Sequence, residues 1–193
     1  MNLANRISLI RIAMTPVFLF LLMPGPFGQY LGLSAWGRWA AVVVFILASA
    51  TDALDGYVAR KYHLVTDLGK FLDPIADKLL VTAALVALIQ TDGLSAWGVF
   101  IILAREFIVS GMRIVAAGQG TVIAASNIAK WKTTFQLIAI ILLLLKDFPL
   151  SLIAPVPVGL IVFWIAVGLT VVSGVDYMKK NAGVLSEAPA GRK

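Results

Sequence analysis

The hydrophobic positions of the chain form six long apolar segments that are separated by short polar breaks. Each segment has at least the roughly 17 residues with which a helix, rising 1.5 Å per residue, can cross the hydrocarbon core of a membrane. Strings rich in proline and glycine, such as Pro24-Gly25-Pro26 and Gly118-Gln119-Gly120, end one helix before the next begins. The expected helices cover residues 7–23, 36–61, 71–91, 95–117, 128–147 and 153–178.

The composition indicates that these helices form a membrane protein. Of the 193 residues, 60% are hydrophobic and 13% are charged, whereas soluble domains are about 45–50% apolar and about 25% charged. So few polar residues cannot cover the surface of a soluble domain of this size. We therefore expect an all-α integral membrane protein built as a bundle of six transmembrane helices.

The whole bundle is expected to be one domain, because the chain has no long linker and no internal repeat. We expect this membrane domain to cover residues 1–180. Residues 181–193 lack an apolar period and are expected to be a flexible tail. The basic and then apolar N-terminus resembles a signal peptide, but no small-residue cleavage pattern follows it, so we expect a retained first helix.

The distribution of basic residues predicts the orientation of the bundle. With the N-terminus in the cytoplasm, only Arg38 and Lys146 fall on the outer side, which satisfies the positive-inside rule. An even number of spans then returns the C-terminus to the cytoplasm. The net charge of +6 therefore concerns topology, membrane lipids and anionic substrates, and we expect no nucleic-acid partner. The basic residues on or near the inner side are Arg6, Arg11, Arg60, Lys61, Lys70, Lys130, Lys132, Lys179, Lys180, Arg192 and Lys193.

Four aspartates lie around the break between the second and third expected helices. Asp52 and Asp55 are three residues apart and share a helix face, and Asp73 and Asp77 are four apart and share a face of the next helix. A short turn between the two helices makes them antiparallel neighbours. All four carboxylates are therefore expected to converge near the cytoplasmic end of the bundle.

Such a cluster needs compensation, since two carboxylates about 5 Å apart repel by roughly 3 kcal/mol at an effective dielectric of about 20. The chain has no cysteine and one histidine, so a metal site here would consist of carboxylates. Carboxylates select hard ions, and two divalent cations, Mg²⁺ or Mn²⁺, suit displacement at phosphorus. Asp73 followed by Pro74 also fits a simpler reading, a helix cap with proline in the first turn.

Small and basic residues accompany the aspartates. Gly56 and Ala59 reduce the side-chain bulk on the face where a nucleotide diphosphate would approach. Arg60 offers a planar donor fork that suits phosphate. Each has an alternative reading, because Gly56 can serve helix packing and Arg60 with Lys61 can serve as a cytoplasmic anchor.

These residues together resemble the signature of the CDP-alcohol phosphotransferase family. The matching string is Asp52-x-x-Asp55-Gly56-x-x-Ala59-Arg60, then eight residues, then Gly69-x-x-x-Asp73-x-x-x-Asp77. The resemblance implies a six-helix membrane enzyme that displaces CMP from a CDP-linked lipid or alcohol with two divalent cations. It implies that the first three aspartates are metal ligands and that Asp77 is both a metal ligand and the base for the acceptor hydroxyl. The implied nucleotide pocket consists of Asp52, Gly56, Ala59, Arg60 and Gly69.

The fourth and fifth expected helices carry charged residues that bear on the acceptor. Arg113, Lys130 and Lys132 lie towards the cytoplasmic ends. Arg113 and Lys130 are expected to bind an acceptor that carries its own phosphate, with Lys132 and Thr133 as weaker candidates. The two lysines have an alternative role as anchors of a helix end. Because Arg105 and its neighbour Glu106 are adjacent, we expect them to point to different sides and to need separate partners.

Three further strings resemble the bacterial phosphatidylglycerophosphate synthase branch of this family: ARE-FIVSG-R, AKWKT and the opening NLANRISLIRI. The opening matches a short N-terminal amphipathic segment of that branch, with Asn5, Ser8 and Arg11 as weaker site candidates beside Arg105. Ser8 stands where that branch is expected to have threonine. The resemblance implies CDP-diacylglycerol as donor, sn-glycerol 3-phosphate as acceptor, a bacterial cytoplasmic membrane with the site facing the cytoplasm, and a homodimer.

Other functions stay open at this point. The same chemistry with inositol phosphate, serine or phosphatidylglycerol as acceptor differs only in the acceptor pocket. A cation transporter would carry acids at several depths of the bilayer, whereas these acids lie on two consecutive helices at one end. A scaffold without chemistry would explain none of the aspartates.

Overall fold

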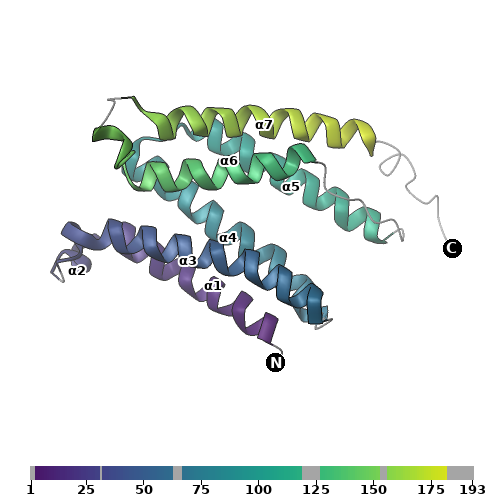
Figure 1. Cartoon of the computed structure of the whole chain (residues 1–193), viewed down its shortest axis with the longest axis horizontal. Coiled ribbons are helices and arrows are strands. Elements are labelled where there is room, and N and C mark those ends of the chain that lie inside the picture. The colour runs from purple at the N-terminus through teal and green to yellow at the C-terminus, as the bar shows by residue number, and fades with distance from the viewer. Residues whose placement is uncertain (1–2, 31, 63–66, 119–126, 153–155, 182–193) are drawn as a thin grey trace. The chain divides into compact units, whose positions relative to one another are not determined.

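The computed structural model describes residues 3–30, 32–62, 67–118, 127–152 and 156–181, and all of its regular elements are helices (Figure 1). Each of the six expected helices is present, with bounds that differ by a few residues. The elements are α1 (Leu3–Leu22), α2 (Gly25–Tyr30), α3 (Leu33–Tyr62), α4 (Asp67–Asp92), α5 (Ala96–Gly118), α6 (Asn127–Leu144), the 3₁₀ turn η1 (Leu150–Leu152) and α7 (Val158–Lys180).

The structure differs from the expected helix boundaries at α1, α2 and α4. The expected N-terminal amphipathic segment is not a separate element, because α1 runs without a break from Leu3. Helix α4 begins at Asp67, so Asp73 lies inside the helix and the reading of Asp73 as a helix cap is wrong. The short α2 begins where the Pro24-Gly25-Pro26 string predicts only a break between helices. The predicted stop after α4 is confirmed, since Gly93 has a φ of 65°.

The chain forms two compact units. The first unit comprises residues 1–94 and 140–156, and the second comprises residues 95–139 and 157–193. The expected tail over 181–193 lies, apart from Asn181, outside the described residues.

In the first unit, α1 packs against both α3 and α4. The rings of Phe18 and Phe45 lie with their centroids 5.8 Å apart. Gly37, near the start of α3, lies so close to α1 that an added Cβ would collide with the carbonyl oxygen of Leu21. The end of α1 therefore meets the start of α3, and the two helices run antiparallel.

Arg38 joins three helix ends in the first unit. Its Nη2 donates to both carboxylate oxygens of Asp92, at 3.0 and 2.9 Å. Its Nη1 donates to the carbonyl oxygens of Leu143 and Leu144, at 3.5 and 3.3 Å. Carbonyls in the last turn of a helix lack intrahelical donors and favour a cation. The start of α3 is thus held against the ends of α4 and α6, so α3 and α4 are antiparallel.

In the second unit, α5 and α7 pack side by side and run parallel. A Cβ added to Gly98 would lie 2.7 Å from the ring of Phe163, and one added to Gly174 would lie 3.1 Å from the side chain of Arg105. Because the contacting positions rise together along both helices, the helices point the same way. The glycines permit this close approach.

Among the described residues, α7 is the one helix that is both long and apolar enough to span a membrane. Apolar stretches at Ser8–Leu22 in α1 and Trp36–Thr51 in α3 are shorter. Helix α5 has sufficient length, but it carries Arg105, Glu106 and Arg113. The regular elements of the described residues are thus all helical.

We expect Arg38→Met to lower the unfolding free energy of the purified protein by about 1–3 kcal/mol, because a bidentate charged hydrogen bond is lost and helix-end carbonyls lose their donor. Thermal unfolding followed by tryptophan fluorescence measures this change. Lys179→Met, which removes an exposed basic side chain of α7, is the matched control and should leave the midpoint unchanged. Equal midpoints for Arg38→Met and the unaltered protein would contradict the structural role of Arg38.

Candidate active site

The aspartates lie on helical backbone at two consecutive helix ends. Asp52 and Asp55 belong to the second half of α3, and Asp73 and Asp77 belong to the first half of α4. Gly56, Ala59 and Arg60 follow on α3. The side chains of all these residues, and Gly69 at the start of α4, fall outside the part whose side chains the structure describes.

The register of the two helices brings the aspartate pairs to one level. Asp52 lies 14 residues beyond Arg38, and Asp77 lies 15 residues before Asp92. At 1.5 Å per residue these separations are about 21 and 22 Å from the Arg38–Asp92 contact, measured along antiparallel helices. Figure 1 shows the end of α3 beside the start of α4. The backbone therefore places both pairs at the same end of the first unit.

Helix α1 brings buried polar residues to the same level. Arg11 precedes Phe18 by seven residues, and Asp52 follows Phe45 by seven, so the contact between the two rings places Arg11 level with Asp52. Ser8 lies one turn further along and is level with Asp55. Ser8 and Arg11 are only 2% and 3% exposed, and both have interaction partners. Buried polar side chains require hydrogen-bond or charged partners. The interior of the first unit therefore contains polar groups at the level of the aspartates.

The donor chemistry of this end fits a hard divalent cation. Four carboxylates within two helical segments supply the oxygen ligands that Mg²⁺ and Mn²⁺ prefer. Elsewhere, among the side chains that the structure describes, no three histidine, cysteine, aspartate or glutamate residues gather. The aspartate end is therefore the candidate metal site.

The second unit contains a charged cluster on α5 and α6. Nη1 of Arg105 donates to Oε1 of Glu106 at 3.1 Å, and Nζ of Lys132 donates to the same oxygen. The expectation that Arg105 and Glu106 have separate partners is wrong, because the long arginine stem brings its guanidinium back to the neighbouring carboxylate. The side chain of Lys132 is only 4% exposed and pairs with Glu106. Its main contact is therefore within the cluster, and it is less accessible to a ligand than an exposed lysine.

The remaining acceptor candidates are exposed. Lys130 and Arg113 both face the surface of the second unit. The guanidinium carbon of Arg113 lies 5.7 Å from the centroid of the Tyr177 ring, a cation–π distance. The hydroxyl of exposed Thr133 donates to a carbonyl of its own helix at 3.1 Å. Arg113 and Lys130 are thus the cations of this group that an external anion can reach.

Sequence reasoning missed two residues of the second unit. Glu106 received no role, although it is the single acid within an otherwise apolar and basic helix. Tyr177 was taken as part of an apolar segment, but it is buried against Val109 and Met112 and supports Arg113. A single acid in an apolar helix indicates a charged partner, whereas nothing in the sequence indicates the contact between Tyr177 and Arg113.

Comparisons with known proteins agree with this arrangement. A family model described as CDP-alcohol phosphatidyltransferase matches residues 1–172. A protein of Bacillus subtilis named CDP-diacylglycerol–glycerol-3-phosphate 3-phosphatidyltransferase is 46% identical over 93% of this chain and 95% of its own. A Rickettsia bellii protein with the same name is 40% identical over 92% and 94%. A Mycobacterium tuberculosis protein named probable phosphatidylglycerophosphate synthase is 41% identical over 93% and 81%.

The matched region includes both aspartate pairs and every charged residue of the second-unit cluster. The likeness covers nearly the full length of this chain and of its relatives. The chain belongs to the CDP-alcohol phosphatidyltransferase family.

Proposed function

We propose that this protein transfers the phosphatidyl group from CDP-diacylglycerol to sn-glycerol 3-phosphate, which forms phosphatidylglycerophosphate and releases CMP. The observation that carries the proposal is the placement of the two aspartate pairs at one level on antiparallel α3 and α4. The names of the relatives support the choice of donor and acceptor. Their identities of 40% to 46% extend over almost the whole chain.

Asp52, Asp55, Asp73 and Asp77 would hold two divalent cations, Mg²⁺ or Mn²⁺. When bound, such a pair of ions neutralises the phosphoryl oxygens and stabilises the entering and leaving oxygens of an in-line displacement. The family signature assigns Asp52, Gly56, Ala59, Arg60 and Gly69 to the cytidine-diphosphate pocket. The guanidinium of Arg60 is suited to pair with the diphosphate.

Asp77 is the proposed general base. Its carboxylate takes the proton from the 1-hydroxyl of glycerol 3-phosphate, and the resulting oxygen attacks the phosphorus that carries diacylglycerol. A phosphorus–oxygen bond forms to the acceptor as the phosphorus–oxygen bond to CMP breaks. The proposed base stands on α4 at the level of Asp52, which puts it at the same end as the ligands.

The acceptor phosphate is assigned to Arg113 and Lys130, because both are exposed. Tyr177 stacks on Arg113 and holds its guanidinium in place. Lys132 and Thr133 remain weaker candidates, since each already has a hydrogen-bond partner. Asn5, Ser8 and Arg11 are weaker candidates at the aspartate end, where Ser8 and Arg11 are buried.

The proposal includes a six-span, N-in and C-in homodimer in the bacterial cytoplasmic membrane, with one domain over residues 1–180. The apolar α7 supports it. So do large apolar side chains on the surface of α5, where Trp97, Phe107 and Ile114 are 76%, 66% and 73% exposed. Exposed apolar patches of this kind mark surfaces that meet lipid or another protein.

The proposed acceptor is tested by assaying the purified protein with CDP-diacylglycerol, Mg²⁺ or Mn²⁺ and a panel of alcohols. We expect CMP release with glycerol 3-phosphate and none after the cations are chelated. Release with inositol phosphate, serine or phosphatidylglycerol in place of glycerol 3-phosphate would overturn the acceptor. Release that persists in a chelator would overturn the metal assignment.

Replacement of the proposed base should abolish most turnover. Asp77→Asn is expected to lower kcat by a factor of about 10² to 10⁴, because a positioned base contributes on this order. Asp176→Asn removes a carboxylate of α7 that pairs with Lys180 and serves as the control. Intact CMP release by Asp77→Asn would show that another group takes the proton.

Loss of the Arg113 guanidinium should affect the acceptor and spare the donor. Arg113→Ala is expected to raise KM for glycerol 3-phosphate about tenfold or more, because a charge-assisted contact to phosphate is removed. Lys179→Ala, which removes one exposed positive charge from the same unit, should leave KM unchanged. An effect confined to KM for CDP-diacylglycerol would contradict the assigned role.

A further inference from the structure

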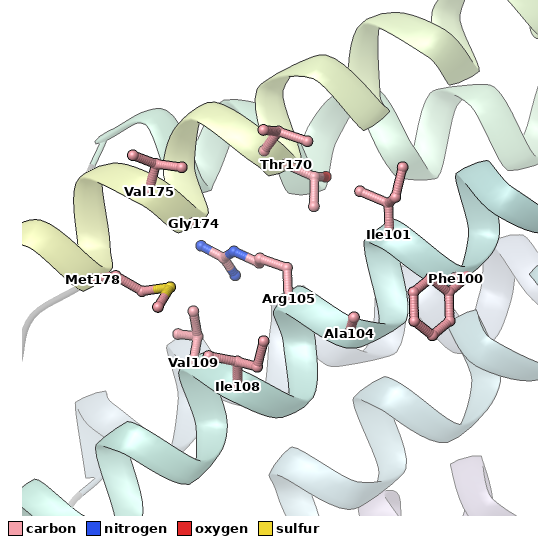
Figure 2. A pocket seen from close by; sticks show the side chains of 11 residues that line it. Phe100, Ile101, Ala104, Arg105, Ile108, Val109, Thr170, Gly174, Val175 and Met178 are labelled. Atoms are coloured by element: carbon pink, nitrogen blue, oxygen red, sulfur yellow. The ribbon is translucent and has the colours of Figure 1, made fainter. Parts of the chain in front are cut away.

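Buried polar atoms that have no hydrogen-bond partner among the described residues occur in both units. In the second unit, two such atoms belong to Arg105, which lines a cavity of about 240 Å³ between α5 and α7, as Figure 2 shows. In the first unit, Oγ of Ser49 is such an atom, although the residue as a whole is half-buried. Ser49 stands on α3, three residues before Asp52, and lies outside the family signature.

The neighbouring hydroxyls of the first unit are bonded to their own helices. Thr51 donates to the carbonyl oxygen of Leu47 at 2.6 Å, and Thr15 donates to that of Arg11 at 3.1 Å. A serine or threonine within a helix can use the carbonyl four residues before it in this way. Oγ of Ser49 makes no such bond. Its hydroxyl is therefore buried and available to another acceptor.

The position of this hydroxyl is unfavourable for the fold alone. Its neighbours on α3, Phe45 and Ala48, are apolar and fully buried. A buried hydroxyl without a partner costs free energy, and an alanine of nearly the same shape would avoid that cost. The packing of the first unit thus gives no reason for a serine here, and a partner that arrives with a ligand would supply one.

The register of α3 places Ser49 on the face of the first aspartate. Residues three and four apart on a helix are neighbours, so Phe45, Ser49, Asp52 and Gly56 follow one another along one stripe. Side chains in a helix lean towards the residues three and four positions before them. Position 49 is therefore within reach of a carboxylate at position 52, about 4.5 Å further along the axis.

A carboxylate that binds a cation needs a second contact. When one of its oxygens ligates the ion, the other requires a hydrogen-bond donor that fixes the orientation of the group, and ligating carboxylates in metal sites are generally held in this way. A serine hydroxyl is suited to this task, because it donates a hydrogen bond without adding a positive charge that would compete with the cation.

We propose that Ser49 is a positioning residue of the aspartate site. Its hydroxyl donates a hydrogen bond to the carboxylate of Asp52 when this aspartate binds a divalent cation. The inference rests on the metal site proposed above and deepens it, since Ser49 acts through Asp52 and itself contacts neither cation nor substrate. All of the residues that it uses belong to α3.

The test is a titration of the purified full-length protein in detergent with Mn²⁺, in which electron paramagnetic resonance measures the free ion and no substrate is present. Ser49→Ala should weaken Mn²⁺ binding about tenfold or more, because loss of a residue that orients a metal ligand has an effect of this size. Thr51→Ala is the matched control. It removes a nearby hydroxyl of α3 that is bonded to its own backbone, and it should bind Mn²⁺ as the unaltered protein does.

Two further replacements separate the hydrogen bond from the bulk of the side chain. Ser49→Thr keeps the hydroxyl and should retain most of the affinity for Mn²⁺. Ser49→Cys has nearly the size of serine but only a weak donor, so it should resemble Ser49→Ala.

Thermal unfolding in a chelator distinguishes a positioning role from a structural one. Ser49→Ala should unfold at the same temperature as the unaltered protein or above it, since the replacement removes a buried hydroxyl that has no partner. Added Mn²⁺ should raise the midpoint of Ser49→Ala less than that of the unaltered protein, because a ligand stabilises a fold according to its affinity. A residue needed only for folding would lower the midpoint in the chelator.

Equal affinity for Mn²⁺ in Ser49→Ala and the unaltered protein would overturn the proposal, and so would a lower midpoint of Ser49→Ala in the chelator. If Ser49→Ala does not fold, equal affinities of Ser49→Thr and Ser49→Cys would overturn it instead. Binding that depends on Asp52, as shown by its loss in Asp52→Asn, but not on Ser49 removes the positioning role alone. If the unaltered protein binds no Mn²⁺, or Asp52→Asn binds it normally, the metal assignment fails and the positioning role fails with it.

Discussion

The antiparallel register of α3 and α4 is the constraint on which the candidate site depends. A helix advances by a fixed rise per residue, so a contact at one end determines which residues are level at the other. The bidentate contact between Arg38 and Asp92 sets this register, and the packing of Phe18 on Phe45 sets that of α1. Arg38, at the opposite end of the two helices, thereby determines the level of acids that lie some 20 Å away along the helix axes.

The charges of the protein are divided between its units. The first unit carries the four aspartates of the signature, whereas the second carries Arg105, Glu106, Arg113, Lys130 and Lys132. Within the second unit, Glu106 accepts hydrogen bonds from two cations, Arg105 and Lys132.

Much of this organisation was predictable from the sequence, because hydropathy and spacing are local properties. The six long helices and the level of the aspartates follow from apolar runs and from offsets of three and four residues. Contacts made by long side chains were not predictable. The pairing of Arg105 with Glu106 depends on how an arginine stem bends, and that of Arg113 with Tyr177 depends on how two distant helices pack. The short α2 was missed because glycine and proline favour turns.

The contact of Gly98 with the ring of Phe163 acts as a spacer for the second unit. Arg105 lies seven residues beyond Gly98, which is two turns of α5, and it meets Gly174 of α7, so the separation of α5 and α7 is set at two positions where a glycine replaces a side chain. A hydrogen atom at each position keeps the helices close, and any larger group would spread them along their length. The space around Arg105 between α5 and α7 therefore depends in part on a residue two turns away.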